Sequence, residues 1–148
     1  MVEGDLNQEI RKKIIVAASG YFDPIHKGHI EYLRKAKELG DKLIVILNND
    51  EQAVKKKGFS FMHTEEKKLI LESLRFVDEV VVSIDNDASV CKSLALIKPN
   101  IFAKGGDRYK GEIPESKICE ELGIKIIDGL GDKIQSSSEL VRNSKKIR

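Results

Sequence analysis

Several features are scarce in this sequence, and each scarcity removes a class of protein. Only two cysteines, Cys91 and Cys119, occur in 148 residues; they lack metal-ligand spacing and are too few for a disulfide framework. No apolar run approaches the roughly 18 residues of a membrane-spanning helix, and the polar start, MVEGDLNQEIRKK, lacks the apolar core of a signal peptide. Lys plus Arg number 26 against 24 acidic residues, so no basic excess points to nucleic acid. We therefore expect a reduced, cytoplasmic protein that binds neither membrane nor nucleic acid.

Two common phosphate-binding motifs are also missing. No G-x-G-x-x-G run follows the first apolar segment, so a dinucleotide-binding turn is unsupported, and no G-x-x-x-x-G-K-[ST] run indicates a P-loop. Histidine is scarce too, yet two of the three histidines, His26 and His29, lie three positions apart with Gly28 between them. This pair is therefore the first candidate for a chemical role.

Apolar runs alternate with amphipathic segments along the chain. Continuous apolar runs are typical of strands covered on both faces, and they predict strands at 13–19, 42–48, 78–84, 100–104 and 124–129. Helical spacing predicts helices from Gly28 to a C-cap at Gly40, from an N-cap at Thr64 to 76, and at 87–97, 113–123 and 136–144. This alternation predicts an α/β fold, a single doubly wound Rossmann-like domain over residues 1–148 (core about 14–142) with a five-stranded parallel sheet.

The unusual residues follow the ends of the predicted strands. SGYFDPIHKGH follows the first strand, NNDEQAVKKKG the second, KGGDR the fourth and GLGDKIQSSS the fifth. In open α/β sheets, ligands bind beyond the carboxyl ends of the strands, where the strand order reverses. We therefore expect these four segments to gather at one edge of the sheet.

The histidine pair stands where the first strand gives way to a helix. Gly28 lets a backbone approach a bound group closely, and a helix start presents free N–H donors and a positive dipole end. Two imidazoles beside that start suit the α-phosphate of a nucleoside triphosphate, whose charge they could stabilise as phosphorus becomes five-coordinate. Zinc is the alternative for His26 and His29, but no third ligand lies nearby. His63 is open between a solvated loop residue and a binding residue.

Four segments of the sequence resemble those of a known family. FDPIHKGHIEYL resembles the H-x-G-H signature of the nucleotidyltransferase superfamily, with the Phe-Asp that accompanies it, in its cytidylyltransferase-like family. KKLILESLRFVDEVV is similar to a segment of glycerol-3-phosphate cytidylyltransferases. KPNIFAKGGDR, followed by IPES, is similar to adenylyltransferases that activate heptose 1-phosphate. KIQSSSELV stands where the family has a second signature that opens the last helix.

The resemblance implies roles for residues in each loop. His26 and His29 would hold the α-phosphate and stabilise its transition state, with Lys56 as the third catalytic residue. The acceptor or the phosphates would be bound by four further lysines, namely Lys55, Lys57, Lys67 and Lys133. The nucleotide would be bound by Tyr21, Phe22, Asp23, Gly28, Lys104, Gly105, Gly106, Asp107, Ser136, Ser137 and Ser138. The plainer alternatives are a solvated lysine face at 55–57, a simple turn at 104–107 and an ordinary helix N-cap at 136–138.

The implied reaction joins a nucleoside triphosphate to a small phosphorylated substrate. An acceptor phosphate attacks the α-phosphorus of CTP or ATP in line, and pyrophosphate leaves. Mg²⁺ would bridge the triphosphate, held mainly by phosphates and water, with no protein metal ligands predicted. Members of the family are commonly dimers, so the resemblance also implies a homodimer.

The acceptor is left open by the sequence. A sugar or polyol phosphate is the first interpretation; a flavin or pantetheine phosphate is the second, weakly disfavoured by an aromatic content of 5%. A non-catalytic nucleotide-binding module is the third. GLGDKIQ replaces the Arg-Thr-Glu-Gly of glycerol-phosphate cytidylyltransferases, and Lys67 stands where those enzymes often have Arg, so neither cytidine nor glycerol phosphate is specified.

Overall fold

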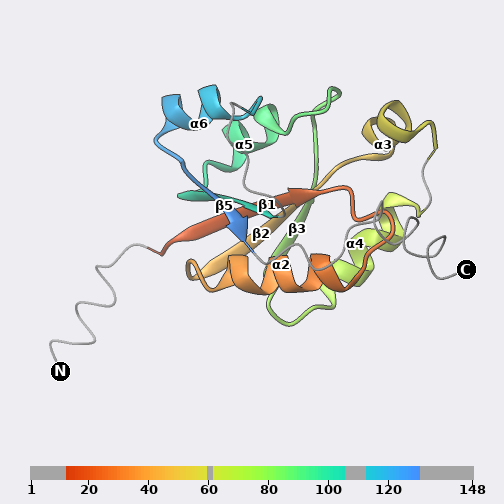
Figure 1. The fold of residues 1–148 in the computed structure, drawn as a ribbon, viewed down its shortest axis with the longest axis horizontal. Helices are drawn as coiled ribbons and strands as arrows, with labels where there is room; N and C mark the ends of the chain where they lie inside the picture. The colour runs from red at the N-terminus through yellow and green to blue at the C-terminus, as the bar shows by residue number, and fades with distance from the viewer. Residues whose placement is uncertain (1–12, 60–61, 106–112, 131–148) are drawn as a thin grey trace, which may run out of the picture.

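A computed structural model describes residues 13–59, 62–105 and 113–130 of the chain. These ranges contain five strands and five helices, which alternate except for two consecutive helices between the second and third strands (Figure 1). The strands are β1 (Ile15–Gly20), β2 (Lys42–Leu47), β3 (Glu79–Val82), β4 (Ile101–Gly105) and β5 (Lys125–Leu130). The helices are α2 (Lys27–Lys37), α3 (Asp50–Lys57), α4 (Thr64–Glu72), α5 (Cys91–Ile97) and α6 (Ser116–Leu122).

The strands form one sheet in the order β3-β2-β1-β4-β5, and every described pair is parallel. The predicted α/β class with a five-stranded parallel sheet is therefore confirmed. The chain moves outward from β1 to β3 in one direction and then returns to β4 on the other side of β1. The strand order thus reverses between β1 and β4, which is where α/β sheets of this kind bind ligands.

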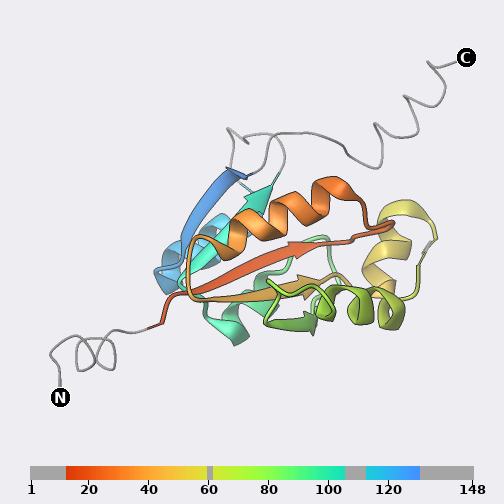
Figure 2. The same ribbon diagram turned by 90° about the horizontal axis from the view of Figure 1, so that it is seen from below.

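Two apolar clusters lie on opposite faces of the sheet. Alternate residues of β1 serve both: Val16 and Ala18 belong to the cluster under α2 and α4, and Ala17 to the cluster under α5 and α6. Figures 1 and 2 show the same layers, with α2 and α4 on one face and α5 and α6 on the other. Helix α3 covers neither face but lies past the carboxyl ends of β1 and β2. Burial on both faces explains why the strands read as continuous apolar runs.

Some local predictions are wrong. The sequence pattern predicts no helix between the second strand and Thr64, but this stretch contains α3, which has Asn49 as N-cap and Gly58 in the left-handed region (φ 86°) as C-cap. Thr64 is the first residue of α4 rather than its N-cap, and its hydroxyl donates to Asp50 Oδ1 (2.5 Å). Helix α2 ends at Lys37, so Gly40 is not its C-cap.

Gly40 has a different use. A Cβ at this position would come within 2.7 Å of the Ile14 carbonyl oxygen, so the turn before β2 needs a residue without a side chain. The remaining boundaries differ from the predicted ones by a few residues at element ends. The helix predicted at 136–144 lies outside the described residues. Among the helices that are described, none has the length and apolarity needed to cross a membrane.

Candidate active site

The site begins with a tight loop between β1 and α2. Phe22 adopts a positive φ of 50° and is almost fully buried, and the Asp23–Pro24 peptide bond is cis. The Phe22 ring lies beneath Gly20, where an added Cβ would be 2.9 Å from Phe22 Cζ, and it meets the His29 ring edge-on at 4.9 Å between centroids. The predicted nucleotide-binding residue Phe22 is therefore also a core residue that supports His29.

His26 and His29 cap the start of α2 reciprocally. His26 is the N-cap, and its Nδ1 accepts a hydrogen bond from the Gly28 amide (3.1 Å). His29 Nδ1 in turn accepts from the His26 amide (3.2 Å), which completes a capping box, and the two rings stack with centroids 3.9 Å apart. The sequence therefore uses two histidines where helices usually carry Ser or Thr with Glu or Gln.

This cap determines which ring nitrogens can donate. Because both Nδ1 atoms accept from backbone amides, a neutral ring at either position must carry its proton on Nε2. Burial lowers the pKa of His26. Burial, followed by the charges of His26 and Lys57, lowers the pKa of His29 to about 4. Both rings are therefore neutral near pH 7, and each presents an Nε2–H.

One of these two N–H donors lacks a hydrogen-bond acceptor in the described part of the protein. His26 Nε2 is buried and has no hydrogen-bond partner among the described residues. Leaving a buried donor unsatisfied costs about 1–3 kcal/mol. An oxyanion bound beside the α2 N-terminus would accept from it and benefit from the helix dipole as well.

The neutral state of His29 makes folding stability pH-dependent. Its pKa falls from 6.5 in the unfolded chain to about 4 in the folded one, so the unfolded state binds more protons between these values. The contribution of neutral His29 to the free energy of unfolding is complete above pH 6.5 and is lost as the pH falls towards 4. Urea unfolding at about pH 5 and pH 7 should show this loss. The variant His29→Gln, which retains an N3 capping side chain, should lose less stability over the same interval; an equal loss in both proteins would contradict the assignment.

The lysines after β2 point in different directions. Lys55 Nζ donates to the Asn86 carbonyl (2.8 Å) and pairs with Glu51, whereas Lys57 Nζ donates to the Asp23 carbonyl (2.6 Å) in the histidine loop. Lys56 Nζ lies 4.3 Å above the centre of the Tyr21 ring. Burial, then the nearby charges of Lys57 and Lys104, lowers the Lys56 pKa. Of the three, Lys56 is the one whose ammonium group lies over the Tyr21 ring.

Lys67 lies under the same loop. Its side chain is completely buried, and Nζ donates to the Tyr21 carbonyl (3.0 Å). Burial lowers its pKa, although the charges of Asp23 and Asp50 oppose this effect. Lys67 and Lys57 thus bind the carbonyl groups at the two ends of the Tyr21–Asp23 segment. Their predicted contact with phosphate stays a prediction. Asp23 Oδ1 accepts from the Met62 amide (2.6 Å), which ties the loop to the segment before α4.

The end of β4 lies close to these residues. Gly105 packs against Tyr32 of α2, and Lys104 Nζ lies over the Phe102 ring at 5.5 Å. The structure therefore brings together the predicted residues of three loops, those after β1, β2 and β4. Six predicted site residues lie outside the described residues, namely Gly106, Asp107, Lys133, Ser136, Ser137 and Ser138. Among described side chains, no group of three or more His, Cys, Asp or Glu could hold a metal ion.

Sequence reasoning missed the residues that anchor α3. Asn49 Nδ2 donates to the carbonyls of Ser83 (3.0 Å) and Asp85 (2.9 Å), and Gln52 Nε2 donates to those of Asp87 (2.6 Å) and Ser89 (3.0 Å). Their oxygens form the capping box of α3. This network fixes the helix that carries Lys56. The Asn-x-x-Gln spacing in NNDEQ was the available signal.

Comparisons with known proteins find similar chains along most of this sequence. A family model described as cytidylyltransferase-like matches residues 17–143. An FAD synthase from Thermococcus sibiricus is 36% identical over 144 residues, which is 93% of each chain. The bifunctional protein HldE of a Nitratiruptor species is 40% identical over 131 residues, which is 86% of this chain but only 27% of HldE. The crystal structure of a lipopolysaccharide core biosynthesis protein from Thermoplasma volcanium superposes with a TM-score of 0.68 at 26% identity, covering 81% of this chain and 98% of that one.

Proposed function

This chain belongs to the cytidylyltransferase-like family, and we propose on that premise that it transfers AMP from ATP to the phosphate of flavin mononucleotide (FMN), forming FAD and pyrophosphate. That it is a nucleotidyltransferase follows from the family and its relatives. The observation that carries the proposed chemistry is the pair of neutral imidazoles at the α2 N-terminus, one with a buried Nε2–H that has no described partner.

The histidines suit an α-phosphate. Nε2–H of His26 and of His29 would donate to its non-bridging oxygens, whose negative charge grows as the acceptor oxygen approaches phosphorus. Donors that are already fixed by the capping box need no reorganisation at that moment, so they stabilise the transition state more than the ground state. Lys56 would add positive charge from α3.

The acceptor needs no general base. A phosphate monoester has a second pKa near 6, so its oxygen is already deprotonated at neutral pH. In the reaction one phosphate oxygen of FMN forms a bond to the α-phosphorus, and the bond from that phosphorus to the β-phosphate oxygen breaks. A histidine with a pKa of about 4 is a poor base near pH 7 but a good neutral donor. The site is therefore suited to a nucleophile that arrives ionised.

FMN is proposed because the FAD synthases match this chain along its length. The Thermococcus sibiricus protein is covered to 93%, whereas this chain spans only about a quarter of the HldE proteins. This weighs more than the low aromatic content, because one or two rings suffice to stack a flavin. A sugar phosphate is the second candidate, favoured by the 40% identity with HldE. Mg²⁺ would enter on the triphosphate; dimerisation, a cytoplasmic location and CTP as an alternative donor remain proposals.

The test is product formation from defined pairs of substrates. ATP or CTP is mixed with FMN, with a heptose 1-phosphate or with glycerol 3-phosphate in the presence of Mg²⁺, and pyrophosphate and FAD are measured. ATP with FMN should give both products in equal amounts. Riboflavin, which lacks the attacking phosphate, is the matched control and should give neither. Pyrophosphate release with a sugar phosphate alone would replace FMN by the second candidate, and no release with any pair would overturn the proposal.

A further inference from the structure

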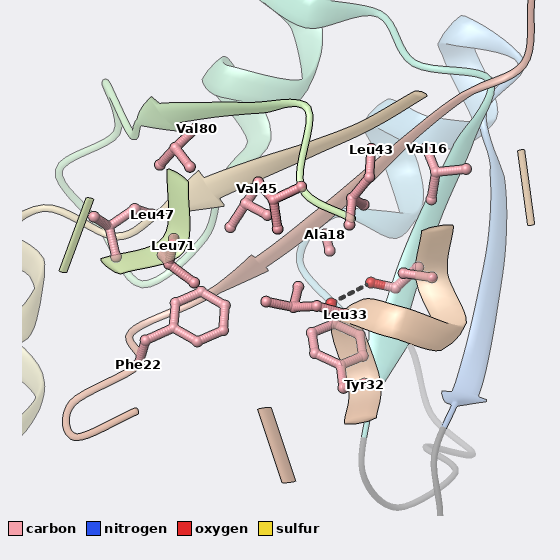
Figure 3. Close-up of a cluster of buried hydrophobic side chains, with 13 residues drawn as sticks. Val16, Ala18, Phe22, Tyr32, Leu33, Leu43, Val45, Leu47, Leu71 and Val80 are labelled. Atoms are coloured by element: carbon pink, nitrogen blue, oxygen red, sulfur yellow. Dashed lines mark hydrogen bonds between the residues drawn. The ribbon is translucent and has the colours of Figure 1, made fainter. Parts of the chain in front are cut away.

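Tyr32 lies where β1 and β4 part at the reversal of the sheet. The register of these strands ends at the pair Ala18↔Ala103. Next to this pair, the buried Tyr32 hydroxyl accepts from the Ser19 amide (3.3 Å) and donates to the Ala103 carbonyl (2.6 Å), the latter drawn as a dashed line in Figure 3. The hydroxyl therefore ties together two strands whose following helices cover opposite faces of the sheet.

The ring of Tyr32 lies against the next residues of β4. A Cβ on Gly105 would be 2.7 Å from Tyr32 Cδ1 and 2.9 Å from Cγ, closer than real carbon contacts allow. The ring cannot move aside freely, because its hydroxyl is held by groups on both strands. The path of the backbone at Gly105 is thus set by Tyr32, which in turn belongs to the same helix as His29.

The end of β4 lies at the same edge of the sheet as the histidine turn, because β4 is parallel and adjacent to β1. The charge of Lys104 also contributes, after burial and Lys57, to lowering the Lys56 pKa. Tyr32 lies one turn after His29 on α2. A single side chain therefore connects the element that presents the histidines with the strand end that leads into the predicted nucleotide loop.

We infer that Tyr32 is a positioning residue for the nucleotide: Tyr32 sets the separation between the histidine turn and the Lys104–Gly105 backbone. This inference rests on the proposed function, because it takes Lys104 and Gly105 to be part of the triphosphate site. Tyr32 itself contacts no reacting group. The Tyr32 hydroxyl holds the ends of β1 and β4 together, and its ring supports Gly105. The nucleotide binds between the histidine turn and the end of β4.

The test uses Tyr32→Phe, which keeps the ring and removes the hydroxyl. Binding of ATP with Mg²⁺ is followed by titration calorimetry, which requires no acceptor, and kcat is measured at saturating ATP. We expect the Kd for ATP to rise roughly 5- to 10-fold, at the lower end of the effect of losing the two hydrogen bonds of the hydroxyl, with kcat and the KM for the acceptor within about 2-fold. The matched control is Ser73→Ala at the exposed C-cap of α4, which also removes a hydroxyl that donates to a backbone carbonyl, that of Leu69. It should leave all three values unchanged.

A second variant tests the ring. Gly105→Ala places a methyl group against Tyr32 and should raise the Kd for ATP at least as much as Tyr32→Phe. In Tyr32→Phe/Gly105→Ala the ring is released and can move, so the two effects should be less than additive. A folded Tyr32→Phe protein with unchanged ATP affinity would overturn the inference, as would strictly additive effects or an equal loss in kcat and both substrate affinities. If the unmodified protein binds ATP but makes no FAD, the proposed acceptor fails while this test still stands; if it binds no nucleoside triphosphate, both fail.

Discussion

Replacing His26 with alanine should lower kcat by about 10²- to 10³-fold, the usual effect of losing one fixed donor to a transition-state oxyanion. The expectation follows from the buried Nε2–H, which has no partner among the described residues and no other evident use. Affinity for ATP should fall far less than kcat, because the ground-state α-phosphate carries less charge than the transition state. The measurement is single-turnover kinetics together with calorimetric binding of ATP.

The alanine variant alone would confuse two roles of His26, since the side chain also caps α2 through Nδ1. His26→Asn separates them, because asparagine is among the best N-cap residues and its side-chain oxygen can accept from the Gly28 amide in the same way. We expect His26→Ala to lose about 1 kcal/mol of stability as well as activity. His26→Asn should keep that stability and still lose kcat by about the same 10²- to 10³-fold.

Two results would contradict this account of the histidine. If His26→Asn restored most of the activity, the cap rather than the Nε2 donor would be the contribution of His26. If both variants lost ATP affinity and kcat equally, His26 would bind the ground state and the transition state alike. Either result would remove the main support for the proposed chemistry of α-phosphate transfer.

The fold could be predicted from the sequence because its strongest signals are local. A strand buried on both faces must be apolar at consecutive positions, as in KLIVILN, and such runs separated by helical segments leave few topologies other than a parallel sheet. The histidine pair was found for a similar reason: His26, Gly28 and His29 lie within one helical turn, so their spacing in sequence is their spacing in space.

The rest of the site depends on contacts between distant segments. Helix α3 has only two buried residues, Gln52 and Ala53, so it shows no apolar periodicity, and its position comes from amide contacts with the 83–89 segment. Three adjacent lysines are equivalent in sequence, but the structure directs Lys55 and Lys57 to two different carbonyl groups. In the sequence, Tyr32 looks like an ordinary core residue of a helix. Only the structure shows that it contacts Ala103 and Gly105.

The direction of Lys56 leads to the second prediction, that Lys56→Met should lower kcat/KM by about 10²-fold. Methionine retains the apolar stem that lies against Tyr21 but removes the charge, so the variant tests electrostatics rather than packing. Burial, and then repulsion from the charges of Lys57 and Lys104, makes the positive charge of Lys56 unfavourable until an anion binds. A triphosphate relieves the repulsion, which is why the loss should appear in the reaction with ATP.

Lys55→Met is the matched control for Lys56→Met. It removes the same charge from the same helix, yet Lys55 is exposed and bonded to Asn86 and Glu51, away from the histidine loop. Its kcat/KM should therefore stay within about 3-fold of the unmodified protein, the scale of one exposed ion pair; a larger loss would instead support the phosphate or acceptor contact that the sequence predicts for Lys55. Equal losses in the two variants would mean that the lysine run acts as a diffuse positive field that attracts the nucleotide, and that Lys56 has no particular place in the site. A loss in Lys56→Met alone would assign the charge next to the α-phosphate to one residue of the three.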